Sequence, residues 1–146
     1  MMKEIRLIHI DDEFVDKSNA RSPDALRYIY WRNYQLCCLP ITFQATNLVN
    51  LQMAGGNIND IWEGNIRKVL NKLRFLYLRK SRLKTFDHET IANLETLEFR
   101  KCKNIVGLHM IITLQNLKIL NLDGLDVSNL NLSQTTSREA KVVVEK

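Results

Sequence analysis

The chain has 146 residues, the size of a single domain, and its formal net charge is +5 at pH 7. With 45% hydrophobic residues but only 5 Gly and 2 Pro, its composition excludes a disordered or collagen-like chain. No apolar run approaches the ~18 residues of a membrane span, and the first residues lack the apolar stretch of a signal peptide. We therefore expect a globular protein of the cytoplasm or the nucleus, with no membrane span.

A leucine-rich unit of the form L-x-x-L-x-L-x-x-(N/C)-x-L-x-x-L recurs along the chain. Its six copies start at Ile5, Leu26, Leu48, Leu73, Leu94 and Leu117. These starts lie 21, 22, 25, 21 and 23 residues apart, within the range of about 20–29 residues that is typical of leucine-rich repeats. The alternation of apolar and polar residues inside each unit predicts a short strand. One such strand cannot bury its own apolar face, so neighbouring copies must stack.

The repeats predict an α/β fold, a leucine-rich-repeat solenoid in the form of a short horseshoe. A parallel sheet of about six repeats forms its concave face, and short helical or irregular segments form the convex one. We expect the repeat domain to span residues 1–132, with a short convex helix at 65–72. A flexible tail follows at 133–146, in which residues 142–144 have the composition of a weak edge strand.

Three stretches carry a resemblance to a known family. Leu26-Arg-Tyr-Ile-Tyr-Trp with Leu39-Pro40, Asn47-Leu-Val-Asn-Leu with Trp62-Glu-Gly, and Leu73-Arg-Phe-Leu-Tyr-Leu follow one another. They resemble the "LRYLxWxxYPLxxLPxxF", "NLVxLxMxxSxIxxLWEG" and "LKxLxLSxS" units of plant nucleotide-binding leucine-rich-repeat disease-resistance proteins, in the subclass with an N-terminal TIR domain. The sequence departs from them at Gln35, where the family usually has Pro, and at Gly56, where it often has Ser.

The resemblance implies the sensor part of an intracellular immune receptor that acts in plant defence. Its partners would be proteins: a pathogen effector, a guarded host protein, or the receptor's own switch domain. The sequence has no G-x-x-x-x-G-K-[ST] loop to hold phosphates, so we expect a truncated form without the TIR and nucleotide-binding domains. The alternative is a free-standing fragment that regulates a receptor or has no activity.

Strand alternation also predicts which side chains line the concave face. In each unit the residues between and beside the two inward leucines point outward, and they form three rows across the sheet. Several are Tyr, Phe or Arg, which favour protein interfaces, although polar strand positions can also be simply solvated. The predicted interaction surface consists of Tyr28, Tyr30, Arg32, Gln52, Phe75, Tyr77, Arg79, Glu98, Arg100 and Asn121.

A basic run offers a second kind of partner. Residues 63–84 contain eight Lys or Arg and one acidic residue, Glu63. Basic residues interleaved with aromatics can bind nucleic acid, but such a run is more often a solvated face or a dock for an acidic protein. We therefore do not expect nucleic acid to be the partner.

Catalysis, metals and cofactors find no support in the sequence. His9, His88 and His109 occupy unrelated positions in the repeats, and no nucleophile and base share a useful spacing. The pair Cys37-Cys38 lacks the second cysteine or histidine cluster of a zinc site, and we expect reduced thiols. Cys102 falls on the (N/C) position of its unit, where a thiol can bond to backbone. We predict a binding protein without cofactor, not an enzyme.

Overall fold

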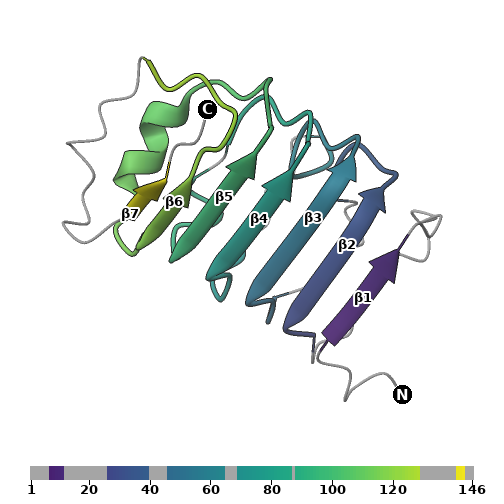
Figure 1. Cartoon of the computed structure of the whole chain (residues 1–146). Coiled ribbons are helices and arrows are strands. Elements are labelled where there is room, and N and C mark those ends of the chain that lie inside the picture. The colour runs from purple at the N-terminus through teal and green to yellow at the C-terminus, as the bar shows by residue number, and fades with distance from the viewer. Residues whose placement is uncertain are drawn as a thin grey trace.

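A computed structural model of the chain describes residues 7–11, 26–39, 46–64, 69–86, 88–128 and 141–143. Seven strands in these ranges form one parallel sheet in the order of the sequence (Figure 1). The strands are β1 (Leu7–Asp11), β2 (Tyr28–Tyr34), β3 (Asn50–Gly56), β4 (Phe75–Arg79), β5 (Thr96–Arg100), β6 (Ile119–Asn121) and β7 (Lys141–Val143). The predicted parallel solenoid is confirmed, with seven strands where about six repeats were expected.

The register of the sheet is the one that the repeats predict. His9 pairs with Tyr30, and the same ladder continues through Gln52, Tyr77, Glu98 and Asn121. Every strand is therefore aligned with its neighbour at the same position of the leucine-rich unit. A slip by one residue would turn each strand's apolar side chains to the solvent, so burial of the leucines fixes this alignment.

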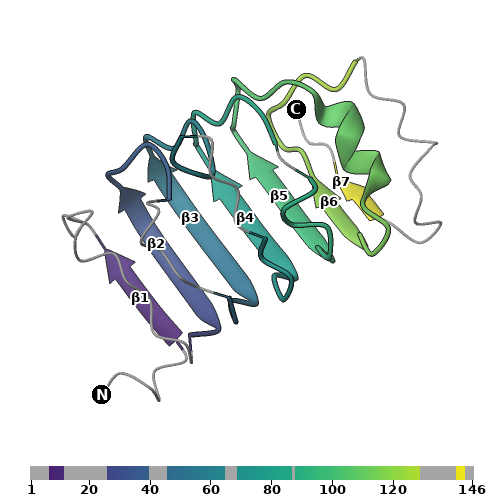
Figure 2. The same ribbon diagram turned by 180° about the vertical axis from the view of Figure 1, so that it is seen from behind.

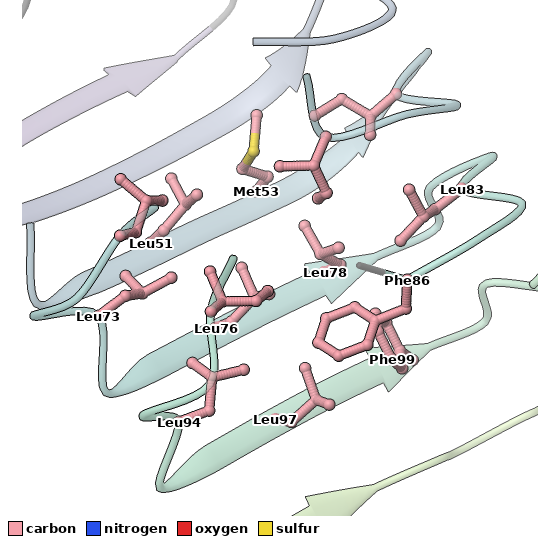
Figure 3. Packing of buried hydrophobic residues seen from close by; sticks show 14 of the residues in the cluster. Leu51, Met53, Leu73, Leu76, Leu78, Leu83, Phe86, Leu94, Leu97 and Phe99 are labelled. Atoms are coloured by element: carbon pink, nitrogen blue, oxygen red, sulfur yellow. The ribbon is translucent and has the colours of Figure 1, made fainter. Parts of the chain in front are cut away.

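Columns of apolar side chains stack beneath the sheet and form the core. The inward residues Leu51, Leu76 and Leu97 are at most 1% exposed. Figure 3 shows these three side by side, with Leu73 and Leu94 forming the next column. One repeat buries little by itself, but each column is enclosed by the repeats on either side, as expected of a solenoid.

A residue with left-handed backbone recurs at the same position of five successive units, near the end of each strand or just after it. The residues in this conformation are Asn33 (φ 53°), Gly55 (63°), Lys80 (55°), Lys101 (57°) and Gly124 (77°). The amides of Lys80 and Lys101 each donate to the next turn, to the carbonyl oxygens of Arg100 and Asp123, at 2.8 Å. These bonds connect consecutive turns along one edge of the sheet. The left-handed region is costly for any residue except glycine, so the repetition shows that the fold imposes it.

The residue after this turn occupies the (N/C) position and faces the core. Cys102 is fully buried, and its thiol lies 3.3 Å from the carbonyl oxygen of Leu78. Ser81, the equivalent residue one repeat earlier, donates to the Cys102 sulfur at 3.2 Å. Burial raises the pKa of the Cys102 thiol, so it stays protonated and able to donate. The predicted structural role of Cys102 is confirmed, and no disulfide joins the three cysteines.

The described parts of the return segments lie on the opposite side of the sheet from the concave face. Figure 2 shows them in front of the strands, together with the 3₁₀-helix η1 (Leu108–Thr113). Residues 65–68 of the predicted convex helix lie outside the described residues, and 69–72 form no helix. The expected edge strand of the tail exists as β7, one residue earlier than predicted, whereas 129–140 are not described. No helix in the described ranges has the length and hydropathy of a membrane span.

A candidate recognition surface on the concave face

The first residues of the strands form a row on the concave face that is apolar at four of its six positions. In register, this first row contains Leu7, Tyr28, Asn50, Phe75, Thr96 and Ile119. Five large hydrophobic side chains of the described residues are exposed, and three of them, Leu7, Tyr28 and Ile119, belong to this row. Exposed apolar groups gathered on one face mark an interaction surface more often than scattered ones do.

The central row is polar and partly aromatic. Tyr30, Gln52, Tyr77 and Glu98 lie beside one another on β2 to β5, and each is half-buried between its neighbours. Burial and then the carboxylate of Glu98 raise the pKa of Tyr77. The Tyr77 hydroxyl is therefore protonated throughout the physiological range and remains a hydrogen-bond donor. A tyrosine combines this polar group with a large apolar ring, and for that reason tyrosine is common at protein interfaces.

The third row is cationic. It places Arg32, Ala54, Arg79 and Arg100 in register on β2 to β5. Arg100 Nε lies 3.4 Å from a carboxylate oxygen of Asp123, so its charge is partly neutralised. In the part of the chain that the structure describes, Arg79 forms no ion pair and is exposed.

Two adjoining hollows open where this row crosses β3. One, of about 230 Å³, lies along the central row and is lined by Tyr30, Gln52, Tyr77 and Glu98, among others. The second, of about 500 Å³, lies over Gly55 and is lined also by Arg79 and Lys80. Both hollows lie where β3 carries the small residue Ala54, and Gly55 lines the second of them, whereas β4 ends in Arg79 and is followed by Lys80.

The basic run does not form a single patch. Arg74 lies at the start of β4, within 4.0 Å of Glu95, and Lys72 donates to the Asn47 side chain at 2.6 Å. Arg79 and the residues after it lie at the other end of the same strand, whereas 65–68 are outside the described residues. The described charges of this run are thus divided between the two ends of strand β4.

All ten predicted surface residues occupy concave positions of β2 to β6. Sequence reasoning missed the contribution of Ala54, Gly55 and Lys80 to the hollow. A partial signal was present, because Ala-Gly-Gly stands at positions where the second, fourth and fifth units carry larger residues. In the described ranges no three His, Cys, Asp or Glu side chains lie close enough to hold a metal ion.

Relatives of the chain are found among plant disease-resistance proteins. Over 110 residues, or 74% of the chain, it is 34% identical to the disease-resistance protein RPP2A of Arabidopsis thaliana. It is also 34% identical over 115 residues to RML1A of the same plant, and 33% identical over 86 residues to RPV1 of Vitis rotundifolia. By sequence and by fold it is a leucine-rich-repeat segment of the plant disease-resistance type.

This repeat segment corresponds to a small part of those proteins, from 6% to 11% of their lengths. No family model matches the chain, and no solved structure does. The family markers Trp31, Leu39 and Trp62 are all buried, at 5% exposure or less. These three markers of the resemblance therefore belong to the core of the repeats.

Proposed function

We propose that this chain is a protein-recognition module of a plant intracellular immune receptor, and that it acts by binding rather than by catalysis. Its partner would be a pathogen effector, a guarded host protein, or a switch domain of the receptor itself. The observation that carries the proposal is the alignment of Tyr30 and Tyr77 with Arg79 and Arg100 on one concave face. Tyr and Arg are the residues that most often dominate binding energy at protein interfaces.

The hollows support a protein partner further. The residues that line them come from four neighbouring strands, so a ligand there contacts several repeats at once. The surface combines half-buried aromatic rings with exposed cations, which is the composition of an interface core with its polar rim. The disease-resistance proteins to which the chain is similar make an immune role the natural setting for such a surface.

A quantitative capture experiment tests this proposal. Wild-type chain, Tyr77→Asp and Val106→Asp are immobilised and exposed to leaf extract from infected and healthy plants. Val106 is exposed outside the concave rows and provides the matched control. We expect at least one protein to be retained by the wild type and by Val106→Asp, and to be lost with Tyr77→Asp. Equal retention by all three proteins would contradict recognition through the concave face.

A further inference from the structure

The concave face changes character along the strand direction. Its first row carries the aromatic residues Tyr28 and Phe75, with the polar Asn50 between them, whereas its third row carries Arg79 and Arg100 at the other end of the strands. Four residues separate the two rows, which corresponds to about 13 Å at ~3.3 Å per residue. Each row runs across the sheet, perpendicular to the strands. A partner that satisfies both rows must be apolar along one side and acidic along the other.

We propose that this face binds an acidic amphipathic helix of a partner protein, laid across the strands. The inference rests on the proposed function and specifies the chemistry of its partner. An α-helix with its side chains is about 10–12 Å wide, which fits the distance between the apolar and the cationic row. Its apolar side would cover Tyr28 and Phe75, and its carboxylates would meet the third row.

The step along the sheet also matches a helix. Neighbouring strands lie about 4.8 Å apart, and side chains at i and i+4 of a helix have Cβ atoms about 5–6 Å apart. Successive turns of a helix advance by about 5.4 Å along its axis, so glutamates spaced by one turn advance by about one repeat at a time. Side chains on one face of an extended strand recur every ~6.6 Å and lose this match within two repeats.

Charge supports an acidic occupant on β2 to β5. On these strands and the turn after β4, the concave side carries Arg32, Arg79, Lys80 and Arg100, and Glu98 is the one carboxylate in the three rows. At the next unit Asp123 pairs with Arg100. The cationic stretch is thus about four strands wide, which corresponds to about 14 Å or roughly ten helical residues.

The hollow over Gly55 adds a place for one large side chain. Ala54 interrupts the row of arginines, and Arg79 and Lys80 line the cavity of about 500 Å³ beside it. A glutamate of the helix that reaches this hollow would approach two cations that form no ion pair within the described residues. Charge-assisted hydrogen bonds of this kind are about twice as strong as neutral ones.

Fluorescence anisotropy with a labelled peptide of about 14 residues tests the proposal. The probe has Glu at i, i+4 and i+7 on one face and Leu and Phe on the opposite face, and a scrambled peptide of equal composition is the first control. We expect the scrambled peptide to bind at least about tenfold more weakly. Arg79→Glu should weaken binding of the probe about tenfold, because it reverses a charge at the centre of the cationic row. Tyr28→Ser should weaken it without changing the salt dependence.

Lys84→Glu is the matched variant, since it makes the same charge change at an exposed position outside the three rows. We expect it to change affinity by less than about threefold. Equal binding of the two peptides, equal losses in Arg79→Glu and Lys84→Glu, or tighter binding of a single-stranded oligonucleotide would each overturn the proposal. If the probe fails while Tyr77→Asp still abolishes capture of a plant protein, the helix inference alone is wrong. If the probe does not bind and Tyr77→Asp retains the same proteins as the wild type, the proposed function is wrong as well.

Discussion

The two faces of the same seven-stranded sheet follow opposite rules. On the inner face, positions such as Ile29, Leu51, Leu76 and Leu97 are all aliphatic and at most 3% exposed. On the concave face, the residues that alternate with them along the strands range from Tyr and Gln to Glu and Arg. The core-facing side is apolar because each side chain must fill a column between two repeats. The concave face has no such packing requirement, so its side chains can vary from one repeat to the next.

Adjacent residues of β4 give the largest effect with which to test this contrast. Leu76→Asp places a carboxylate in a column that is 1% exposed, and we expect it to cost at least about 4 kcal/mol of unfolding free energy. Tyr77→Asp changes an outward side chain of the same strand and should cost about 1 kcal/mol or less. Urea melts followed by circular dichroism measure both. Similar losses in the two variants would mean that the strand register is wrong.

The last residue of β3 gives the next largest effect. At Gly56 the backbone φ is 146°, and a Cβ atom would lie 2.7 Å from the carbonyl oxygen of Tyr34. We therefore expect Gly56→Ser to destabilise the chain by about 2–3 kcal/mol. This also gives a physical reason why the chain departs here from the Ser of the resembling units.

Gly64→Ser is the control for that substitution, measured in the same urea melts. Gly64 also has a positive φ, 63°, but a Cβ there would meet no atom within 4 Å. Its cost should be limited to the left-handed conformation, about 1 kcal/mol. A Gly56→Ser variant as stable as Gly64→Ser would show that the close approach to Tyr34 relaxes without cost.

Lys80 has both a structural and a surface role. Its backbone is held in the left-handed conformation, and its side chain lines the hollow over Gly55. Lys80→Gly removes the strain of a left-handed lysine, and the greater chain entropy of glycine offsets part of that gain. We expect a net stabilisation of about 0.5 kcal/mol, together with weaker binding of the acidic peptide. Lys84→Gly, where φ is not positive, should be neutral or destabilising. If Lys80→Gly were less stable than the wild type, the left-handed conformation of Lys80 would not be a source of strain.

The sequence was sufficient to predict the parts of the fold that repeat. The spacing of Leu26, Leu48, Leu73 and Leu94 determined the strand order and the register, because any other alignment exposes leucines. The role of Cys102 followed from its place in the same unit. Each of these inferences uses a position that several copies share, so that errors in one copy are corrected by the others.

Features that depend on one repeat alone were not predictable in the same way. The hollow over Gly55 arises because small residues of β3 lie beside large ones of β2 and β4, and it appears only when the three strands are in place. The division of the basic run between two edges likewise follows from the length of β4. The sequence marks the small residues of β3, but it does not show the hollow or the division of the charges, since both depend on which side chains become neighbours across repeats.

The smallest expected effect lies at the start of the strands, where charges serve the stacking of repeats. Lys118 Nζ lies 2.9 Å from Glu95 and lowers the pKa of that carboxyl below its ordinary value of 4.5, with a lesser contribution from Arg74. A lowered folded-state pKa stabilises the fold at any pH above 4.5, and this contribution disappears as the pH falls through the folded value. Glu95→Gln should therefore be slightly less stable than the wild type at neutral pH and equally stable in acid.

Urea melts of the wild type and Glu95→Gln from neutral pH downwards measure this difference. Because the pair of Lys118 and Glu95 is exposed, added salt should reduce the difference. A difference that persists unchanged in acid would show that Glu95 acts through packing, and that the charges at this edge contribute nothing to the stacking of the repeats.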